Sequence, residues 1–396
     1  MNLLKHEIVK LLRSPAIYGF LVACLAINAF IVFASSRNYY IDYMNEVSEI
    51  TGTLYGEDYL ERLQSVSETD DYGYISWRYM EVLGAAESAG NIFADGNGGR
   101  EIKNALANGE IPLSDTAIKI QLWKYELLTP VIEAKAERDD GASVYFGPYT
   151  AGIHNAIFGG AGNIGIGMIT AAQTCVFFIL IMLWTLGFET MSGTDLVVWS
   201  TKTGRRLIQG KIIAALTIGT GFFLITYAVT YGLTFAVNDY SVVWSQNVSA
   251  QYNMVWDQHF KWLPVITWKS MTIGEYFFAG TGIALLNGIV AALIAIPFGL
   301  LIRNTYVAFC SIVGIILMHY LLVMYASQSE GTIPFIWNIS MIFPLLQVIS
   351  SSIWFTDGGT RMLLPHFETL YPLICMLLLC PVIIISIKKF LRKEIV

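Results

Sequence analysis

The chain has 396 residues, of which 55% are hydrophobic and 14% are charged, and its formal net charge at pH 7 is −6. Soluble domains carry about a quarter charged residues, so this composition excludes an ordinary soluble domain. Charge is absent from several stretches of about 20 residues, the length that crosses about 30 Å of hydrocarbon. We therefore predict an all-α membrane protein, because a helix satisfies its own backbone hydrogen bonds in lipid.

Residues 1–14 predict a short amphipathic helix. Its apolar face carries Leu4, Ile8 and Leu11, and its polar face carries Lys10 and Arg13. A helix of this kind lies in the membrane interface with its apolar side toward the acyl chains. The proline that follows is tolerated at the first position of a helix, so residues 1–34 are expected to form an interfacial elbow helix and the first span.

Six stretches predict transmembrane helices: Ala16–Ala34, Ile166–Phe188, Ile212–Val237, Tyr276–Ile302, Tyr306–Ala326 and Tyr371–Ile387. One more uncharged run, 333–355, contains Pro334 and Pro344. Its prolines suit a broken helix sheltered by protein. We interpret this run as a re-entrant region before the last span, with a seventh full crossing as the alternative.

The basic residues predict the orientation, because Lys and Arg collect in cytoplasmic loops. With six spans, the segments on the N-terminal side of the membrane hold 12 basic and four acidic residues. The segment 35–165 holds 20 acidic and nine basic residues. Both termini are thus predicted to be cytoplasmic, in a multi-pass plasma-membrane protein of a bacterium. The basic face suits an anionic lipid bilayer, and no motif indicates nucleic acid.

Residues 35–165 predict a large, mostly helical extracellular domain after the first span. Apolar residues recur at helical spacing over Asp42–Glu68, Ile75–Phe93 and Leu113–Lys135, separated by Asp- and Gly-rich turns. A structural cap is one interpretation of this domain, and a lid that captures a ligand is the other. Neither this domain nor the rest of the chain carries a catalytic constellation or clustered metal ligands, so no catalytic or metal site is predicted.

The membrane domain, 166–396, contains a long inner loop over 189–211 between the second and third spans. A short helix is expected there from about Gly193 to Ser200, outside the bilayer and able to dock on a cytoplasmic partner. The alternative is an ordinary loop that carries positive charge. A string from Gly204 to Lys211 looks like a phosphate loop, but it has five residues between its glycines and Ile212 where Ser or Thr would hold magnesium. This chain is therefore expected to bind no ATP itself.

The fourth span carries small residues every four positions: Gly280, Ala284, Gly288 and Ala292. Such rows let helix backbones approach closely in lipid. His319 in the fifth span is the one ionisable group predicted within a span, as part of a transport path or as a hydrogen-bonded structural residue. The centres of the spans hold no Asp, Glu, Lys or Arg, which disfavours an ion-coupled carrier and favours an amphipathic cargo.

This layout resembles the permease subunit of a type-2 ABC (ATP-binding cassette) exporter over the whole chain. The resemblance rests on the opening LLKHEIVKLLRSP and on the loop pattern E-x-x-x-G-T-x-x-L-x-x-x-S-T-x-x-x-R. The loop residues concerned are Glu189, Gly193, Thr194, Leu196, Ser200, Thr201, Arg205 and the neighbouring Arg206. The outer segment after the first span, 35–165, is longer than the corresponding segment in many members of that family.

The resemblance implies two permease copies, or two related permeases, around a central path. Two cytoplasmic ABC ATPase subunits, which bind ATP and magnesium, would contact the loop and the elbow helix. The chain is then a transport subunit rather than an enzyme, exporting a peptide, an antibiotic or a lipid-like molecule. The alternatives are a membrane sensor or scaffold with a ligand-binding outer domain, and a secondary transporter.

Overall fold

The computed structural model describes residues 2–36, 58, 61–62, 64–65, 103–111, 113–136, 165–200, 202–237, 244–245, 248, 254–257, 261–264, 267–326, 333–358 and 362–392. The regular structure of these residues is helical apart from one short antiparallel hairpin, formed by β1 (Met254–Asp257) and β2 (Lys261–Pro264), and an isolated bridge between Thr267 and Thr356. The predicted helices over Asp42–Glu68 and Ile75–Phe93 lie outside the described residues.

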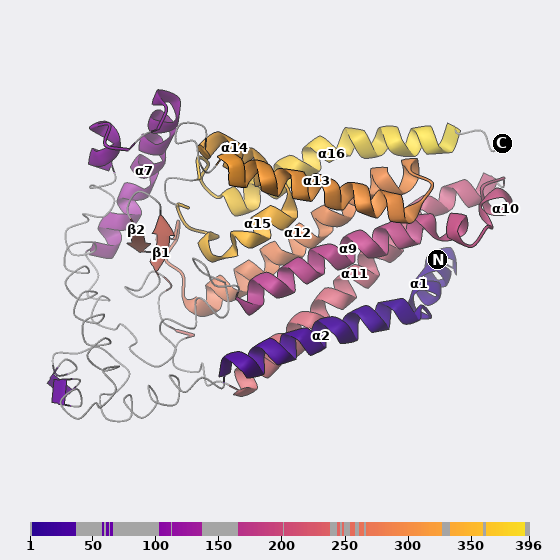
Figure 1. The fold of residues 1–396 in the computed structure, drawn as a ribbon, viewed down its shortest axis with the longest axis horizontal. Helices are drawn as coiled ribbons and strands as arrows, with labels where there is room; N and C mark the ends of the chain where they lie inside the picture. The colour runs from indigo at the N-terminus through magenta and orange to yellow at the C-terminus, as the bar shows by residue number, and fades with distance from the viewer. Residues whose placement is uncertain are drawn as a thin grey trace.

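Within the part of the chain that the structure describes, six helices are long and apolar enough to cross a membrane, as the sequence predicts. They are α2 (Pro15–Ser36), α9 (Ile166–Met191), α11 (Lys202–Val237), α12 (Ile273–Leu301), α13 (Thr305–Ala326) and α16 (Phe367–Arg392). Both chain termini lie at one end of this bundle, while α7 (Asp115–Ala136) and the hairpin lie at the other (Figure 1). The two ends are called the terminal end and the α7 end below.

Local signals account for several helix boundaries. Pro15 begins α2 directly after α1 (Asn2–Leu12). At the start of α12, Thr272 and Glu275 form a reciprocal capping box that satisfies two backbone N–H groups. Asn304 accepts hydrogen bonds from the backbone N–H groups of Tyr306 and Val307 (2.9 and 3.2 Å), so α13 restarts after a tight turn.

The centre of the bundle is α9, which packs against α12 on one side and α11 on the other. The ring of Phe178 on α9 is fully buried between the two neighbours. A Cβ on Gly288 of α12 would lie 2.7 Å from this ring, and a Cβ on Gly219 of α11 would overlap it from the other side. The two glycines therefore set how closely α11 and α12 approach α9.

The row of small residues on α12 faces this core within the subunit. Ala284 and Ala292 are buried, and Gly288 contacts α9. Gly280, at the α7 end of the row, lies against the ring of Trp354. This end of the row therefore packs on the run 333–355, called the interrupted region below, rather than on α9. By contrast α2, α13 and α16 leave most of their apolar side chains exposed.

The run 333–355 forms separate short helices: α14 (Ile333–Ser340), α15 (Pro344–Ile349) and a 3-10 turn over Ser351–Ile353. Pro344 stands in the first turn of α15 and has no N–H to continue α14. None of these pieces is among the six helices long enough to span a membrane. The helix is thus broken just before Pro344, the second of the two prolines in this run. The second piece, α15, packs against α9 and α12.

We expect Gly288→Ala to lower the free energy of unfolding by about 1–3 kcal/mol, because the new methyl group would press on Phe178 and on Thr174, 3.0 Å away. Thermal unfolding of the purified protein in detergent measures the change. Gly282→Ala is the matched control, since it lies on the same helix with nothing within 4 Å of its Cβ position. Equal behaviour of the two variants would contradict the assigned contact.

Candidate functional site

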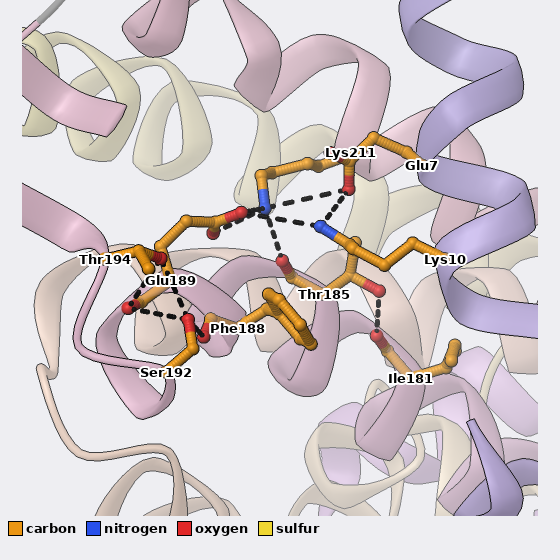
Figure 2. Close-up of polar contacts among 9 residues, drawn as sticks. All are labelled: Glu7, Lys10, Ile181, Thr185, Phe188, Glu189, Ser192, Thr194 and Lys211. Carbon is orange, nitrogen blue, oxygen red and sulfur yellow. Dashed lines mark hydrogen bonds and ion pairs between the residues drawn. The ribbon is translucent and has the colours of Figure 1, made fainter. Parts of the chain in front are cut away.

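Four charged side chains from three helices meet at the terminal end of the bundle (Figure 2). Glu7 and Lys10 come from α1, Glu189 from the last turn of α9, and Lys211 from α11. Lys211 Nζ lies 2.6 Å from both carboxylate oxygens of Glu189, and Lys10 Nζ lies 2.6 Å from Glu7 Oε2. Longer contacts join the two pairs, at 3.4 Å from Lys10 to Glu189 and 3.8 Å from Lys211 to Glu7. We call these four residues the charge cluster.

The charge cluster is buried and electrically balanced. Lys211 is 0% exposed, and Glu7 and Glu189 are each 5% exposed. Lys211 also donates to the backbone oxygen of Thr185 (3.0 Å), and the Thr185 hydroxyl donates one turn back to Ile181 O. Lys10 lies 4.3 Å above the ring of Phe188. Two carboxylates thus compensate two ammonium groups, which a buried site requires.

The backbone after Glu189 leads directly into a short exposed helix, α10 (Asp195–Ser200). Thr194 N donates to Glu189 O (2.9 Å), and Ser192 Oγ donates to Phe188 O (2.9 Å). Gly193 has φ +69°, a left-handed backbone conformation that residues other than glycine rarely adopt. These bonds attach the start of α10 to the same turn of α9 that supplies Glu189.

Helix α10 presents apolar side chains to solvent. Leu196 is 54% and Val197 is 72% exposed, although both lie beside the charged terminal end. Asp195 pairs with Arg303 in the turn between α12 and α13 (3.2 Å), and the Arg303 side chain is 72% exposed. This helix is too short to be stable alone, so its contacts with α9 and α11 must position it.

The remaining predicted loop residues are only partly described. Ser200 lies in α10 and Arg205 and Arg206 lie in α11, and the structure describes their backbone alone; Thr201 is outside the described residues. The string Gly204–Lys211 is continuous helix within α11, and Lys211 Nζ is bound to Glu189. Neither its backbone nor its lysine is arranged as a phosphate loop.

Among the residues predicted for the elbow helix, Lys10 lies differently from the prediction. Leu11 is buried, Leu4 and Ile8 pack against the same core, and Arg13 is exposed. Lys10 was predicted on the polar face but points into the charge cluster, because Glu7 beside it is buried. Sequence reasoning missed Glu7. Its position, three residues after Leu4 and four before Leu11, places it within the apolar stripe, and that signal was present in the sequence.

His319 is half-buried on α13 and makes two contacts. Its Nδ1 lies 3.1 Å from Ile315 O, one turn back, and its ring centroid lies 4.1 Å from that of Phe343. A stronger polar contact in the spans, also missed, is Asn28 on α2. The Asn28 amide bonds Gln173 of α9 (3.0 and 2.8 Å) and Thr230 of α11 (2.9 Å), which ties α2 to the core helices.

At the α7 end, α7 docks on the loop between the 3-10 turn and α16. Lys124 is fully buried and donates to the backbone oxygens of Asp357 and Met362, both at 2.9 Å. The Tyr125 hydroxyl donates to Asp357 Oδ2 (2.9 Å), and Gln121 donates to Met362 O (3.0 Å). The predicted helix Leu113–Lys135 is therefore present as α7, and its buried face is polar as well as apolar.

The docked loop is joined in turn to the interrupted helices. Asn338 of α14 accepts from Leu363 N (3.0 Å) and from the Tyr371 hydroxyl of α16. Gln347 of α15 donates to the backbone oxygens of Phe367 and Glu368 (3.1 and 3.0 Å). Helix α7, the interrupted region and the start of α16 thus form one hydrogen-bonded assembly.

We expect Lys211→Met to lower the free energy of unfolding by about 3–5 kcal/mol, because two buried carboxylates are then left with Lys10 as their one counter-charge in the cluster. The double variant Glu189→Gln/Lys211→Met restores balance and should recover a large part of this loss. Asp195→Asn breaks the exposed pair with Arg303 and should cost at most about 1 kcal/mol. Thermal unfolding in detergent compares the three; equal losses for Lys211→Met and Asp195→Asn would be inconsistent with a buried cluster.

We expect Lys124→Met to loosen α7 from the membrane helices. The buried Asp357 carbonyl oxygen loses its lysine donor, while Met362 O keeps the Gln121 donor. The loss costs about 1–3 kcal/mol and should raise local hydrogen exchange of 115–136 about 5- to 150-fold. Lys119→Met, on the exposed side of the same helix, is the control and should leave exchange unchanged. Hydrogen exchange read by mass spectrometry makes the comparison. Unaltered protection of α7 in the Lys124 variant would refute the docking contact.

Among the described residues, no group of three or more His, Cys, Asp or Glu is placed to hold a metal ion. Comparison of the chain with models of protein families, with curated proteins and with solved structures returned no match. The described residues thus place an exposed apolar helix, α10, directly after the turn of α9 from which buried charges join α1 and α11.

Proposed function

We propose that this chain is the membrane-spanning subunit of an ATP-driven ABC exporter that moves an amphipathic peptide, antibiotic or lipid-like substrate outward. The energy comes from two copies of a separate cytoplasmic ATPase, which binds ATP and magnesium. A second permease copy or a related permease completes the transport path. The observation that carries this proposal is the buried charge cluster directly at the base of the exposed helix α10.

The proposed coupling runs through short, direct contacts. The ATPase contacts Leu196 and Val197, and movement of α10 reaches α9 through the Thr194–Glu189 hydrogen bond. From Glu189 it reaches α11 through Lys211, and α1 through Lys10. Because a buried ion pair cannot separate without a large desolvation cost, the three helices move together rather than independently.

The contacts of Glu189 and Gly193 define a role for each of them in this proposal. Glu189 is buried, so it is a positioning residue that holds α10 through Lys211 rather than a contact for a partner. Gly193 is exposed with nothing within 4 Å of its Cβ position, and its left-handed backbone accounts for the glycine. A bulky residue at Gly193 would therefore strain the turn itself, so partner contact is tested at other positions.

The proposed orientation places the terminal end of the bundle in the cytoplasm of a bacterium and the α7 end outside the plasma membrane. Its support is the excess of basic residues in the segments at the terminal end. In this orientation α1 lies at the inner interface, the interrupted helices α14 and α15 are re-entrant from outside, and residues 35–165 form the extracellular domain.

Leu196→Asp and Val197→Asp should each weaken association with the ATPase at least about tenfold, which corresponds to about 1.4 kcal/mol, because a charge replaces an apolar contact. Gln209→Asp is the control, since it adds the same charge to an exposed site of α11 outside α10. The readouts are ATPase co-purification and ATP-dependent transport in proteoliposomes at matched protein levels. Retained association and transport in both α10 variants would reject α10 as the coupling element.

A sensor or scaffold with a ligand-binding outer domain is the second candidate, and the docking of α7 on the segment before α16 favours it. In that case the purified chain should signal or bind a ligand without any ATPase. A secondary transporter is the third candidate, and it would move substrate in response to an ion gradient alone. The same proteoliposomes, with ATPase and ATP omitted and an ion gradient imposed, separate the three candidates.

A further inference from the structure

A cavity of about 590 Å³ opens at the terminal end, between the ends of α12 and α16. Its volume lies in the range of ordinary ligand sites, about 300–1,000 Å³. The lining combines two chemistries, three cations and four apolar side chains: Lys388, Lys389, Arg392, Leu300, Leu301, Ile385 and Phe390. The charge cluster and α10 contribute no residue to this cavity.

The three cations carry more positive charge than is needed to compensate the C-terminal end of α16. A helix C-terminus carries the equivalent of about half a negative charge, whereas Lys388, Lys389 and Arg392 carry three positive charges. None of the three forms an ion pair with a carboxylate among the residues that the structure describes. All three are exposed. Most of their charge is therefore available to an anion that enters the cavity.

The apolar part of the lining continues along the membrane-facing side of α16. Ile385 is exposed at the mouth of the cavity, and Ile384, Leu378 and Leu377 expose further apolar surface toward the middle of the helix. A ligand that fits both chemistries has an anionic group at the level of Lys388 and hydrocarbon below it. A soluble anion would contact only the cations and would leave the apolar surface uncovered.

We propose that this cavity binds the headgroup of an anionic phospholipid, with the phosphate between Lys388, Lys389 and Arg392 and an acyl chain along the exposed apolar side of α16. Arg can bind phosphate oxygens in a bidentate manner, and the two lysines add point charges. The proposal requires only that α12 and α16 cross a membrane, and it does not depend on the exporter function.

The test uses the full chain, purified in mild detergent and delipidated, with native mass spectrometry of bound lipid. Phosphatidylglycerol should bind more tightly than phosphatidylcholine of the same chain length. Lys388→Gln/Arg392→Gln should weaken phosphatidylglycerol binding about 30-fold, since each basic side chain near the membrane surface contributes about 1 kcal/mol. Lys388→Arg keeps the charge and should retain binding.

The matched control is Lys5→Gln/Arg13→Gln, which removes two exposed cations, one on α1 and one directly after it, at the same end of the bundle. This variant should change phosphatidylglycerol binding less than about threefold. Equal losses in both double variants would overturn the proposal in favour of diffuse attraction. Full competition by millimolar inorganic phosphate would overturn it in favour of a soluble-anion site. Equal binding of the two lipids to the unaltered protein would overturn it even if the cavity variant failed to fold.

Discussion

The charge cluster is the interaction on which the rest of the terminal end depends. Removing a carboxylate and an ammonium group from water costs several kcal/mol each, and only close pairing offsets that cost. The Glu7–Lys10 pair lies within α1 and the Glu189–Lys211 pair joins α9 to α11, so the four groups are buried as one balanced cluster only when all three helices are in register. The cluster therefore specifies where α1 lies against the bundle, and it fixes the last turn of α9, from which α10 begins.

Three levels of the bundle are held by different chemistry. At the terminal end, charges join α1, α9 and α11; in the interior, the Phe178 ring between Gly219 and Gly288 brings α11 and α12 close to α9. At the α7 end, Lys124 and Tyr125 bind the loop before α16. The helices with little buried surface, α2, α13 and α16, surround this framework and face lipid or a partner. Helix α9 is the element common to the terminal end and the interior, since it packs against α10, α11, α12 and α15.

The sequence predicted the spans well, because hydrophobic length alone decides which segments cross a bilayer. It also predicted α7 from helical spacing, a break in 333–355 from Pro344, and a short helix after Gly193. It did not predict that Glu7 and Lys10 join Glu189 and Lys211 in one cluster, because the two pairs are far apart in the chain and single charges near span ends look like ordinary flanking residues. The side of α12 that packs within the subunit, and the docking of Lys124 on backbone carbonyls, depend on tertiary contacts that no local pattern encodes.

The most direct test of the account is photo-crosslinking from a benzophenone side chain placed at Val197, in cells of the native host, with products identified by mass spectrometry. Val197 is the most exposed apolar residue of α10 for which the structure describes the side chain. The account predicts a crosslinked product that contains an ATP-hydrolysing cassette subunit, and none when the same group is placed at Phe30, on the exposed side of α2. Crosslinking at Val197 only to lipid, or to proteins without a nucleotide site, would contradict the role of α10 as the contact for an ATPase.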